Sequence, residues 1–178
     1  MLKIQEVKTT PSLELFSELV ELLQETVSDG ASIGFLTAPA TKDARNYWTG
    51  ILEQVGRGER RLFVATDDHV CAGSVQLVRP QKANATHRGE VQKLMVNTQF
   101  RRRGIGSALI NALEKAAIDD GLTLLVLDTR SGDPAERLYS KLHWKAVGQI
   151  PNFARSANGR LEPTTVFYRE LPSVPGEF

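Results

Sequence analysis

The feature that most constrains the fold is the segment RRRGIG at residues 101–106, because it joins a predicted strand to a predicted helix. Gly104 and Gly106 lack a Cβ atom, so the main chain can turn inward there and aim its N–H groups at an anion. The helix that follows adds the positive end of its dipole, and the three arginines add guanidinium groups that suit phosphate oxygens. This turn therefore predicts a site for a phosphate or pyrophosphate.

A short Gly-x-Gly pattern is also typical of an ordinary helix start with a solvated basic turn, so its position decides its meaning. The segment lacks the Gly-Lys-Ser/Thr ending of a nucleotide-triphosphate loop and the third glycine of the dinucleotide fingerprint. It lies between a predicted strand at residues 90–97 and a predicted helix at residues 105–117, and apolar residues 122–127 follow as a buried strand. This order predicts a parallel βαβ crossover.

Hydrophobic periodicity and turn signals predict the elements on either side of this unit. They are strands at residues 3–7, 61–66, 70–78, 144–150 and 164–171, and helices at residues 11–28, 42–55 and from 134 onward. For the first helix we expect Thr10 as the cap and Pro11 at the first helical position, and for the last helix we expect Asp133 as the cap. A long loop rich in Pro, Asn and Gly should join the last two strands.

Length and composition favour one domain at residues 1–171 with a C-terminal tail at residues 172–178. The formal net charge of +1 gives no reason to expect nucleic-acid or membrane-surface binding. Cys71 is the single cysteine, which excludes an internal disulfide, and the three histidines are too scattered to suggest a metal site. We therefore expect no metal. We find no signal peptide or membrane span, and we expect a cytoplasmic protein.

The sequence resembles the GNAT superfamily of N-acetyltransferases, whose signature Arg/Gln-x-x-Gly-x-Gly/Ala is matched by Arg101, Gly104 and Gly106. Segments similar to VQKLMV, SALINALEKAA, LLVLD and AERLYSKLHW occur in that family in the same order. Within it the chain looks most like the tabtoxin-resistance acetyltransferases, on the segments GASIGF, EVQKLMV, LDT and AE-x-x-Y. One departure from the wider family is Gly132, where many members carry an asparagine.

This resemblance implies an α/β (α+β mixed) GNAT fold, with a central mixed, mostly antiparallel twisted sheet, a parallel splayed strand pair and about four flanking helices. It also implies direct transfer of the acetyl group from acetyl-CoA to the primary amine of a small amino-acid-like molecule, such as a toxin or antibiotic of the tabtoxin β-lactam type. Two other functions stay open: acetylation of a protein N-terminus or lysine, and non-catalytic sensing of acetyl-CoA. We expect a monomer or homodimer with a small-molecule partner.

The resemblance also implies where acetyl-CoA binds. The matching positions are Leu94, Met95, Val96, Arg101, Arg102, Arg103, Gly104, Ile105, Gly106 and Ser107. It further implies that Glu90 is the general base, that Asp128 attracts the amine or shares in its deprotonation, and that Tyr139 protonates the departing thiolate. Which of the two carboxylates is the principal base stays open.

Residue patterns alone allow other roles for these side chains. Glu90 could pair with a neighbouring cation at a strand edge, Asp128 could cap a helix or loop, and Tyr139 could be a core residue with one hydrogen bond. The resemblance also makes candidate substrate contacts of Ser32, Phe35 and Trp48, although packing in the core is the usual role of such aromatic residues.

Overall fold

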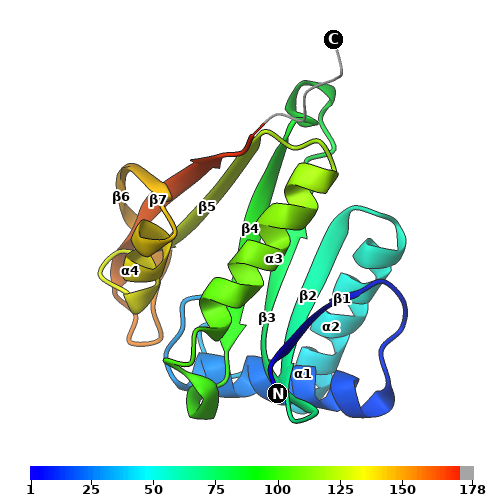
Figure 1. Ribbon diagram of the computed structural model, residues 1–178. Helices are drawn as coiled ribbons and strands as arrows, with labels where there is room; N and C mark the ends of the chain where they lie inside the picture. The colour runs from blue at the N-terminus through cyan, green and yellow to red at the C-terminus, as the bar shows by residue number, and fades with distance from the viewer. Residues whose placement is uncertain (173–178) are drawn as a thin grey trace.

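The computed structural model describes residues 1–172 and shows one seven-stranded sheet with two helices on each face (Figure 1). The strand order is β1-β2-β3-β4-β5-β7-β6. Every neighbouring pair is antiparallel except β4 and β5, which are parallel. The predicted fold class is therefore confirmed. The predicted tail lies outside the described residues from position 173 onward.

The elements of this sheet and its helices fall close to the predicted ranges. The strands are β1 Lys3–Val7, β2 Arg60–Asp67, β3 Val70–Val78, β4 Arg88–Val96, β5 Leu124–Arg130, β6 Lys145–Arg155 and β7 Leu161–Glu170. The helices are α1 Leu13–Ser28, α2 Thr41–Gly56, α3 Ile105–Asp119 and α4 Pro134–Lys141, with short 3-10 turns at Ala83–Ala85 and Thr98–Phe100. No helix within residues 1–172 has the length and apolar character that a bilayer crossing demands.

The start of α1 differs from the prediction. Ser12, not Thr10, is the cap: its side-chain oxygen accepts a hydrogen bond from the Leu15 main-chain N–H at 3.2 Å. Pro11 consequently precedes the helix. Serine and threonine are both good caps, so the sequence offered two starts and the structure uses the later one.

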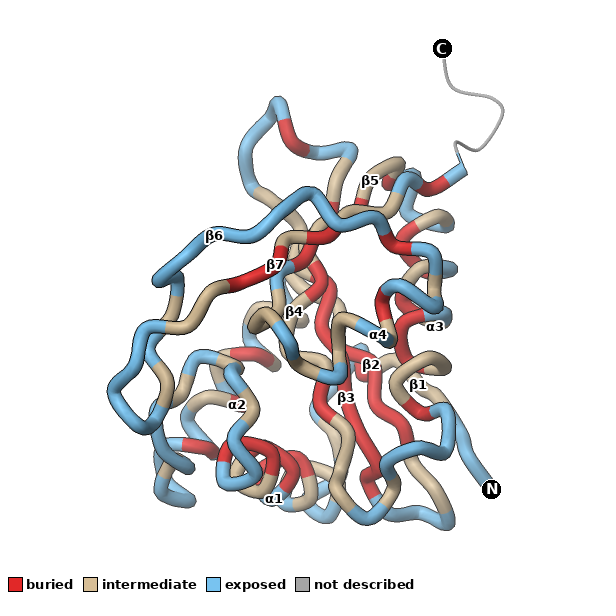
Figure 2. Tube along the Cα trace, turned by 90° about the vertical axis from the view of Figure 1, so that its left-hand side faces the viewer, coloured by how far each residue is buried: buried red, intermediate tan, exposed pale blue. Residues whose placement is uncertain are grey.

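The region between the last two strands also differs, because the predicted long loop is a strand hairpin. β6 and β7 pair as far as Arg155 and Leu161, so only residues 156–160 form the turn. The pairing register shifts between Ile150 and Ala154, which accommodates Pro151 and its inability to donate to the ladder. β6 is the edge strand and is exposed along nearly its whole length (Figure 2).

Two apolar cores form on the two faces of the sheet. One lies between the sheet and α3, and includes Leu109, Leu113 and Leu125. The other lies between the sheet and α1 and α2, and includes Leu19 and Trp48. Trp48 is fully buried, and its indole N–H donates to the Leu19 carbonyl at 2.7 Å, so truncation to alanine should cost about 3–5 kcal/mol of stability.

The parallel strands β4 and β5 are joined only at one end. Their pairing covers residues 88–90 and 124–126, and beyond it the strands separate (Figure 1). The cause lies in β4, where Met95 pairs with Ser74 but Gln92 pairs with Gln76, so that β4 holds one extra residue. Such a bulge bends the strand, and Lys93 at this point has a φ of +54°. The separation opens a space between the two strands.

Candidate active site

A cavity of about 370 Å³ occupies the space between β4 and β5. Its walls come from the loop between α1 and α2, from β4, from β5 and the turn after it, from α4, and from the β6–β7 hairpin. The lining residues are Ala31, Ser32, Ile33, Gly34, Glu90, Val91, Gln92, Lys93, Leu94, Asp128, Thr129, Arg130, Asp133, Ala135, Tyr139, Phe153, Ala154, Glu162, Pro163 and Thr164.

Glu90 and Asp128 reach this cavity from opposite walls. Glu90 pairs with Val126 in the parallel register, and Asp128 is two residues further along β5, which continues to Arg130. An oxygen of Glu90 accepts from the Gln92 amide at 2.7 Å, and an oxygen of Asp128 accepts from the Thr164 hydroxyl at 2.8 Å. Among the described residues neither carboxylate has a cation within 4.0 Å. Both therefore keep their charge available to a ligand.

Tyr139 forms the cavity wall that α4 contributes. The residue is 5% exposed, and its ring lies against the rings of Trp144 and Phe167, with centroids 5.8 Å and 5.7 Å away. Burial, and to a smaller extent the charge of Asp128, raises the pKa of Tyr139, so the hydroxyl remains protonated at neutral pH. Its oxygen has no hydrogen-bond partner within residues 1–172, so this proton is free for a ligand.

The start of α4 explains the glycine at position 132. Gly132 has a φ of +84°, a conformation that glycine adopts without strain, and its N–H donates to Glu136 at 3.0 Å. Glu136 thus satisfies a main-chain donor at the helix start, but Asp133, which we predicted as the cap, makes no capping hydrogen bond with its side chain. The carboxylate of Asp133 instead accepts from Arg130 at 2.9 Å.

The turn at residues 101–106 has the free donors that its sequence predicts. In the part of the chain that the structure describes, the main-chain N–H groups of residues 102–107 have no acceptor. Gly104 has a φ of +77°, which favours glycine. A Cβ atom on Gly106 would lie 3.1 Å from Leu138 of α4 and 4.0 Å from Leu94 of β4. The first turn of α3 therefore lies against α4 and against Leu94, which lines the cavity.

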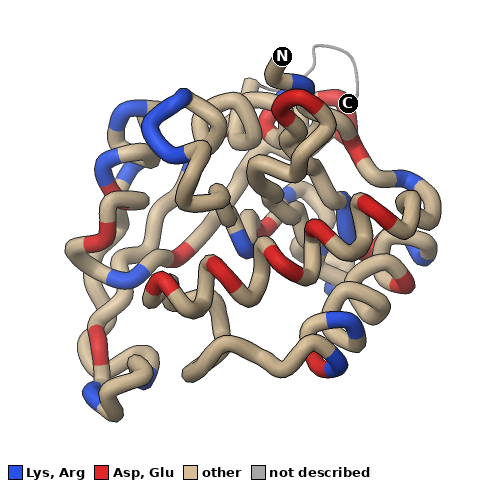
Figure 3. The backbone as a smooth tube through the Cα atoms, turned by 90° about the horizontal axis from the view of Figure 1, so that it is seen from below, with Lys and Arg blue, Asp and Glu red and all other residues tan. Residues whose placement is uncertain are grey.

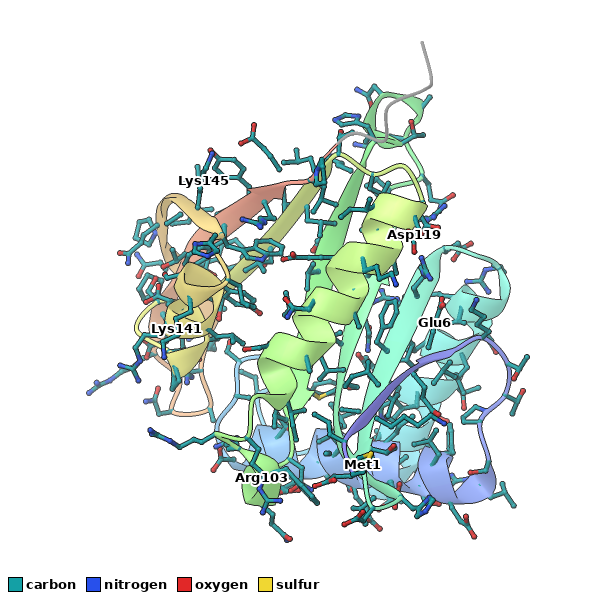
Figure 4. All side chains as sticks on the ribbon, viewed as in Figure 1. Met1, Glu6, Arg103, Asp119, Lys141 and Lys145 are labelled. Carbon is teal, nitrogen blue, oxygen red and sulfur yellow. The ribbon has the colours of Figure 1, made fainter. Side chains whose placement is uncertain are left out.

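The three arginines of this turn differ in their surroundings. Arg101 pairs with Asp29 at 2.6 Å, and Arg103 lies 3.6 Å from Asp67 with its guanidinium over the ring of Phe100. Arg102 has no ion-pair partner within residues 1–172. Figure 3 shows how the Lys and Arg positions are spread along the backbone, and Figure 4 shows Arg103 at the foot of α3, at the opposite end of the helix from Asp119. Exposed pairs of this kind are weak, so a phosphate can compete for the guanidinium groups.

Several predicted site residues lie away from the cavity. Trp48 is in the core beneath α1, and Phe35 packs edge-on against Tyr47 with ring centroids 5.6 Å apart. Of the three predicted substrate contacts, only Ser32 lines the cavity. Met95 and Ile105 are 1% and 2% exposed in the two cores, so only their main-chain groups can reach a ligand.

The cavity also contains residues that the sequence analysis missed. Lys93, Arg130 and Glu162 add charged groups to its lining, and Phe153 adds an aromatic ring from the hairpin. Lys93 lies within the quoted segment EVQKLMV, which could have drawn attention to it. Phe153 and Glu162 had no such signal, because they lie in the segment that we predicted to be a long loop between the last two strands.

Among residues 1–172, no three His, Cys, Asp or Glu side chains gather closely enough to hold a metal ion. The charged groups of the cavity are instead carboxylates and two cations, and the donors beside it are main-chain N–H groups. Such an arrangement can bind an anion at the turn, attract an amine at the carboxylates and move protons between them.

Comparison with known proteins gives consistent matches over most of the chain. Residues 18–144 match the Acetyltransferase (GNAT) family. An uncharacterised N-acetyltransferase of Azospirillum brasilense, from the hisH-hisA intergenic region, is 33% identical over 115 residues, which cover 64% of this chain and 67% of that protein.

Two solved structures show the likeness of the fold. A structure described as a candidate acetyltransferase from Salmonella typhimurium, with its cofactor acetyl-CoA, has a TM-score of 0.78 at 17% identity and covers 98% of this chain and 96% of that chain. The ribosomal-protein-alanine N-acetyltransferase from Brucella melitensis has a TM-score of 0.79 at 19% identity, and the match covers 95% of this chain and 99% of that chain.

Proposed function

The chain belongs to the GNAT family of acetyltransferases, which use acetyl-CoA, and on that premise we propose that it acetylates the primary amine of a small amino-acid-like molecule. The observation that carries this proposal is the cavity between β4 and β5. Its lining includes Glu90 and Asp128, which have no ion-pair partner among the described residues, together with the protonated hydroxyl of Tyr139, and a turn of free N–H donors lies beside it.

Acetyl-CoA supplies an acetyl group bound as a thioester. The free N–H groups of residues 102–107 and the guanidinium of Arg102 suit its pyrophosphate, because helix starts and arginines both favour phosphate oxygens. The absence of a side chain at Gly106 lets the start of α3 pack closely against Leu138 of α4 and Leu94 of β4. Residues 94–96 lie on the edge of β4 that has lost its partner strand, so their main-chain groups can pair with the amides of the pantetheine arm.

The acceptor amine must be neutral before it can attack the thioester carbonyl. Asp128 attracts the ammonium form, and Glu90 removes a proton from it, directly or through one water. As the new N–C bond forms and the C–S bond breaks, the Tyr139 hydroxyl gives its proton to the departing sulfur, and the second proton that the nitrogen loses replaces it on the Tyr139 oxygen. A free N–H on β4 near Leu94 can stabilise the negative charge that develops on the carbonyl oxygen.

The dimensions of the cavity favour a small acceptor. A volume of about 370 Å³ is near the lower end of small-molecule sites. The loop at residues 31–34 borders it on one side and the hairpin residues Phe153 and Glu162 border it on another, whereas a peptide acceptor requires an open groove. A toxin or antibiotic of the tabtoxin β-lactam type is one acceptor of suitable size.

The test is a screen of amino acids, simple amines and short peptides with acetyl-CoA, with the release of free thiol as the signal. We expect turnover with amino-acid-type amines and little with peptides. Faster turnover with peptides would favour acetylation of proteins. Saturable binding of acetyl-CoA in calorimetry, without thiol release for any acceptor, would favour a sensing module.

A further inference from the structure

Lys93 is the one lysine that lines the cavity, and it lies on the same wall as Glu90. Its ammonium group donates a hydrogen bond to the carbonyl oxygen of Ile33 at 2.6 Å. The loop at residues 31–34, which borders the cavity, is therefore tied to the bulge of β4 through this side chain. One of the three ammonium protons is used in this contact, and two remain.

The ammonium group of Lys93 has no charged partner. Within residues 1–172 no carboxylate oxygen lies within 4.0 Å of its nitrogen. Burial lowers the pKa of Lys93, and the nearby guanidinium of Arg60 lowers it further, against the weaker opposing charges of Asp128 and Glu90. A partly buried cation without a partner is costly, and an anion that enters the cavity would remove that cost.

The backbone holds Lys93 in an unusual conformation. Its φ of +54° is rare for a residue with a side chain, and it coincides with the bulge that opens the site. Strained positions of this kind persist where the surrounding structure supports them, and they cluster at ligand sites. The bulge therefore fixes where the lysine enters the cavity.

We propose that Lys93 binds the carboxylate of the acceptor, which makes the substrate a zwitterionic amino acid whose amine faces Glu90 and Asp128. This inference rests on the proposed function and makes it more specific. The cavity then has two poles, an anion-binding pole at Lys93 and a cation-binding pole at the two carboxylates. Arg130, the other cation of the lining, is not equivalent, because it is already paired with Asp133 at 2.9 Å.

The experiment compares acceptors that differ only in the carboxylate. Suitable pairs are L-lysine with cadaverine and L-phenylalanine with phenethylamine, each assayed for kcat/KM by thiol release. For the wild-type protein we expect the amino acid of a pair to be preferred. Lys93→Met should lower the ratio of the two kcat/KM values, amino acid over amine, about tenfold to hundredfold. A hydrogen bond to a charged group usually contributes a free energy that corresponds to a factor of this size.

Two further variants separate the charge from the tie to the loop. Lys93→Gln removes the charge but retains an N–H donor for the Ile33 carbonyl, and we expect it to lose the preference as Lys93→Met does. Lys115→Met, on the exposed face of α3, removes a lysine that does not line the cavity and should leave the preference unchanged. Thermal melting of each variant confirms that it is folded.

Lys93→Met could lower kcat/KM equally for both members of a pair, and Lys93→Gln could restore it. That result would show that Lys93 only holds the loop, and it would overturn the inference. A wild-type preference for the decarboxylated amines would overturn it as well. Both results leave the proposed function intact, because acetyl transfer still occurs. Absence of turnover with every amine would instead contradict the proposed function, and the inference with it.

Discussion

The side-chain amide of Gln92 donates a hydrogen bond to the carboxylate of Glu90 across 2.7 Å, from the adjacent position on the same face of β4. The other end of the same amide accepts from the guanidinium of Arg60 at 3.1 Å. Arg60 also donates to Gln54 at 2.9 Å. A chain of hydrogen bonds therefore runs from the start of β2 to the proposed base, and it holds one oxygen of Glu90 in place.

Gln92→Leu tests this relationship. The apolar side chain has a similar size, but it leaves Glu90 without its donor and Arg60 without one acceptor. Because misplacement of a reacting group by a small distance is costly, we expect kcat to fall about tenfold with the affinity for acetyl-CoA unchanged. Steady-state kinetics and calorimetry measure the two quantities. Gln92→Glu, which cannot donate to Glu90, should not restore the rate; recovery there would show that Gln92 acts only by filling space.

Glu90→Gln tests the base itself. The substitution preserves shape and removes the ability to accept a proton, so we expect kcat to fall about 10²–10⁴-fold and the pH dependence of the rate to change. Binding of acetyl-CoA should be nearly unaffected, because Glu90 lies away from the turn at residues 101–106. Glu53→Gln on the exposed face of α2 is the matched control. Equal losses in rate and in cofactor affinity would identify Glu90 as a structural residue.

The central part of this fold could be predicted because its signals are local. The spacing of apolar residues in α3 and the continuous apolar run of β5 each predict one element, and RRRGIG marks the turn between β4 and α3. Family resemblance then placed Glu90, Asp128 and Tyr139, and the cavity contains all three.

The remaining wall of the cavity has no local signal. β6 is an edge strand exposed on both faces, so its residues lack the alternation that predicts a strand, and Pro151 and Asn152 indicate a loop instead. The bulge at Lys93 depends on the pairing of β4 with β3, which no spacing within β4 reveals. Family resemblance suggested Trp48 as a substrate contact, but it packs in the core, which is the usual role that we noted for such aromatic residues.

Gly106→Val tests the opening at the phosphate turn. A Cβ atom there would lie 3.1 Å from Leu138 of α4 and 4.0 Å from Leu94 of β4, so valine would push apart the elements that hold the phosphate turn in place. We expect the dissociation constant of acetyl-CoA to rise more than about tenfold, which corresponds to about 1.4 kcal/mol. Calorimetry measures it.

Gly50→Ala is the control for Gly106→Val. Gly50 lies inside α2 with no atom within 4 Å of an added Cβ, so alanine should stabilise the protein by about 0.5–1 kcal/mol without affecting acetyl-CoA. Unchanged affinity in Gly106→Val would exclude close approach of the coenzyme at this turn.

Tyr139→Phe tests the proposed acid. The hydroxyl has no partner among the described residues, so its removal should change the melting temperature little, while the ring keeps its contacts with Trp144 and Phe167. We expect kcat to fall about 10²-fold, because the departing thiolate loses its proton donor. Tyr168→Phe, on the last strand, is the matched control. With an acyl donor whose thiolate is a poor leaving group, the difference in kcat between Tyr139→Phe and Tyr168→Phe should increase. Equal kcat values for Tyr139→Phe and the wild type would show that Tyr139 serves packing alone.

Cys71 offers a test of direct transfer that does not depend on the acceptor. The residue is 2% exposed on β3, and burial raises the pKa of its thiol to about 12. A thiol of this kind is not an effective nucleophile at neutral pH, so an acetylated-cysteine route is disfavoured. We expect Cys71→Ala to retain kcat and the native wild-type protein to resist Ellman's reagent until it is unfolded.

The same pKa predicts how stability depends on pH. Near pH 7 the thiol is protonated in both the folded and the unfolded chain, so it contributes no pH dependence. As the pH rises above about 8.5 the unfolded chain ionises while the buried thiol does not, which favours unfolding by about 1.4 kcal/mol per pH unit. Urea titrations at pH 7 and pH 10 should therefore show a loss in the wild type that exceeds the loss in Cys71→Ala by roughly 2 kcal/mol. Parallel losses in the two proteins would mean that the thiol ionises in the folded state, and rapid native labelling by Ellman's reagent would then be expected.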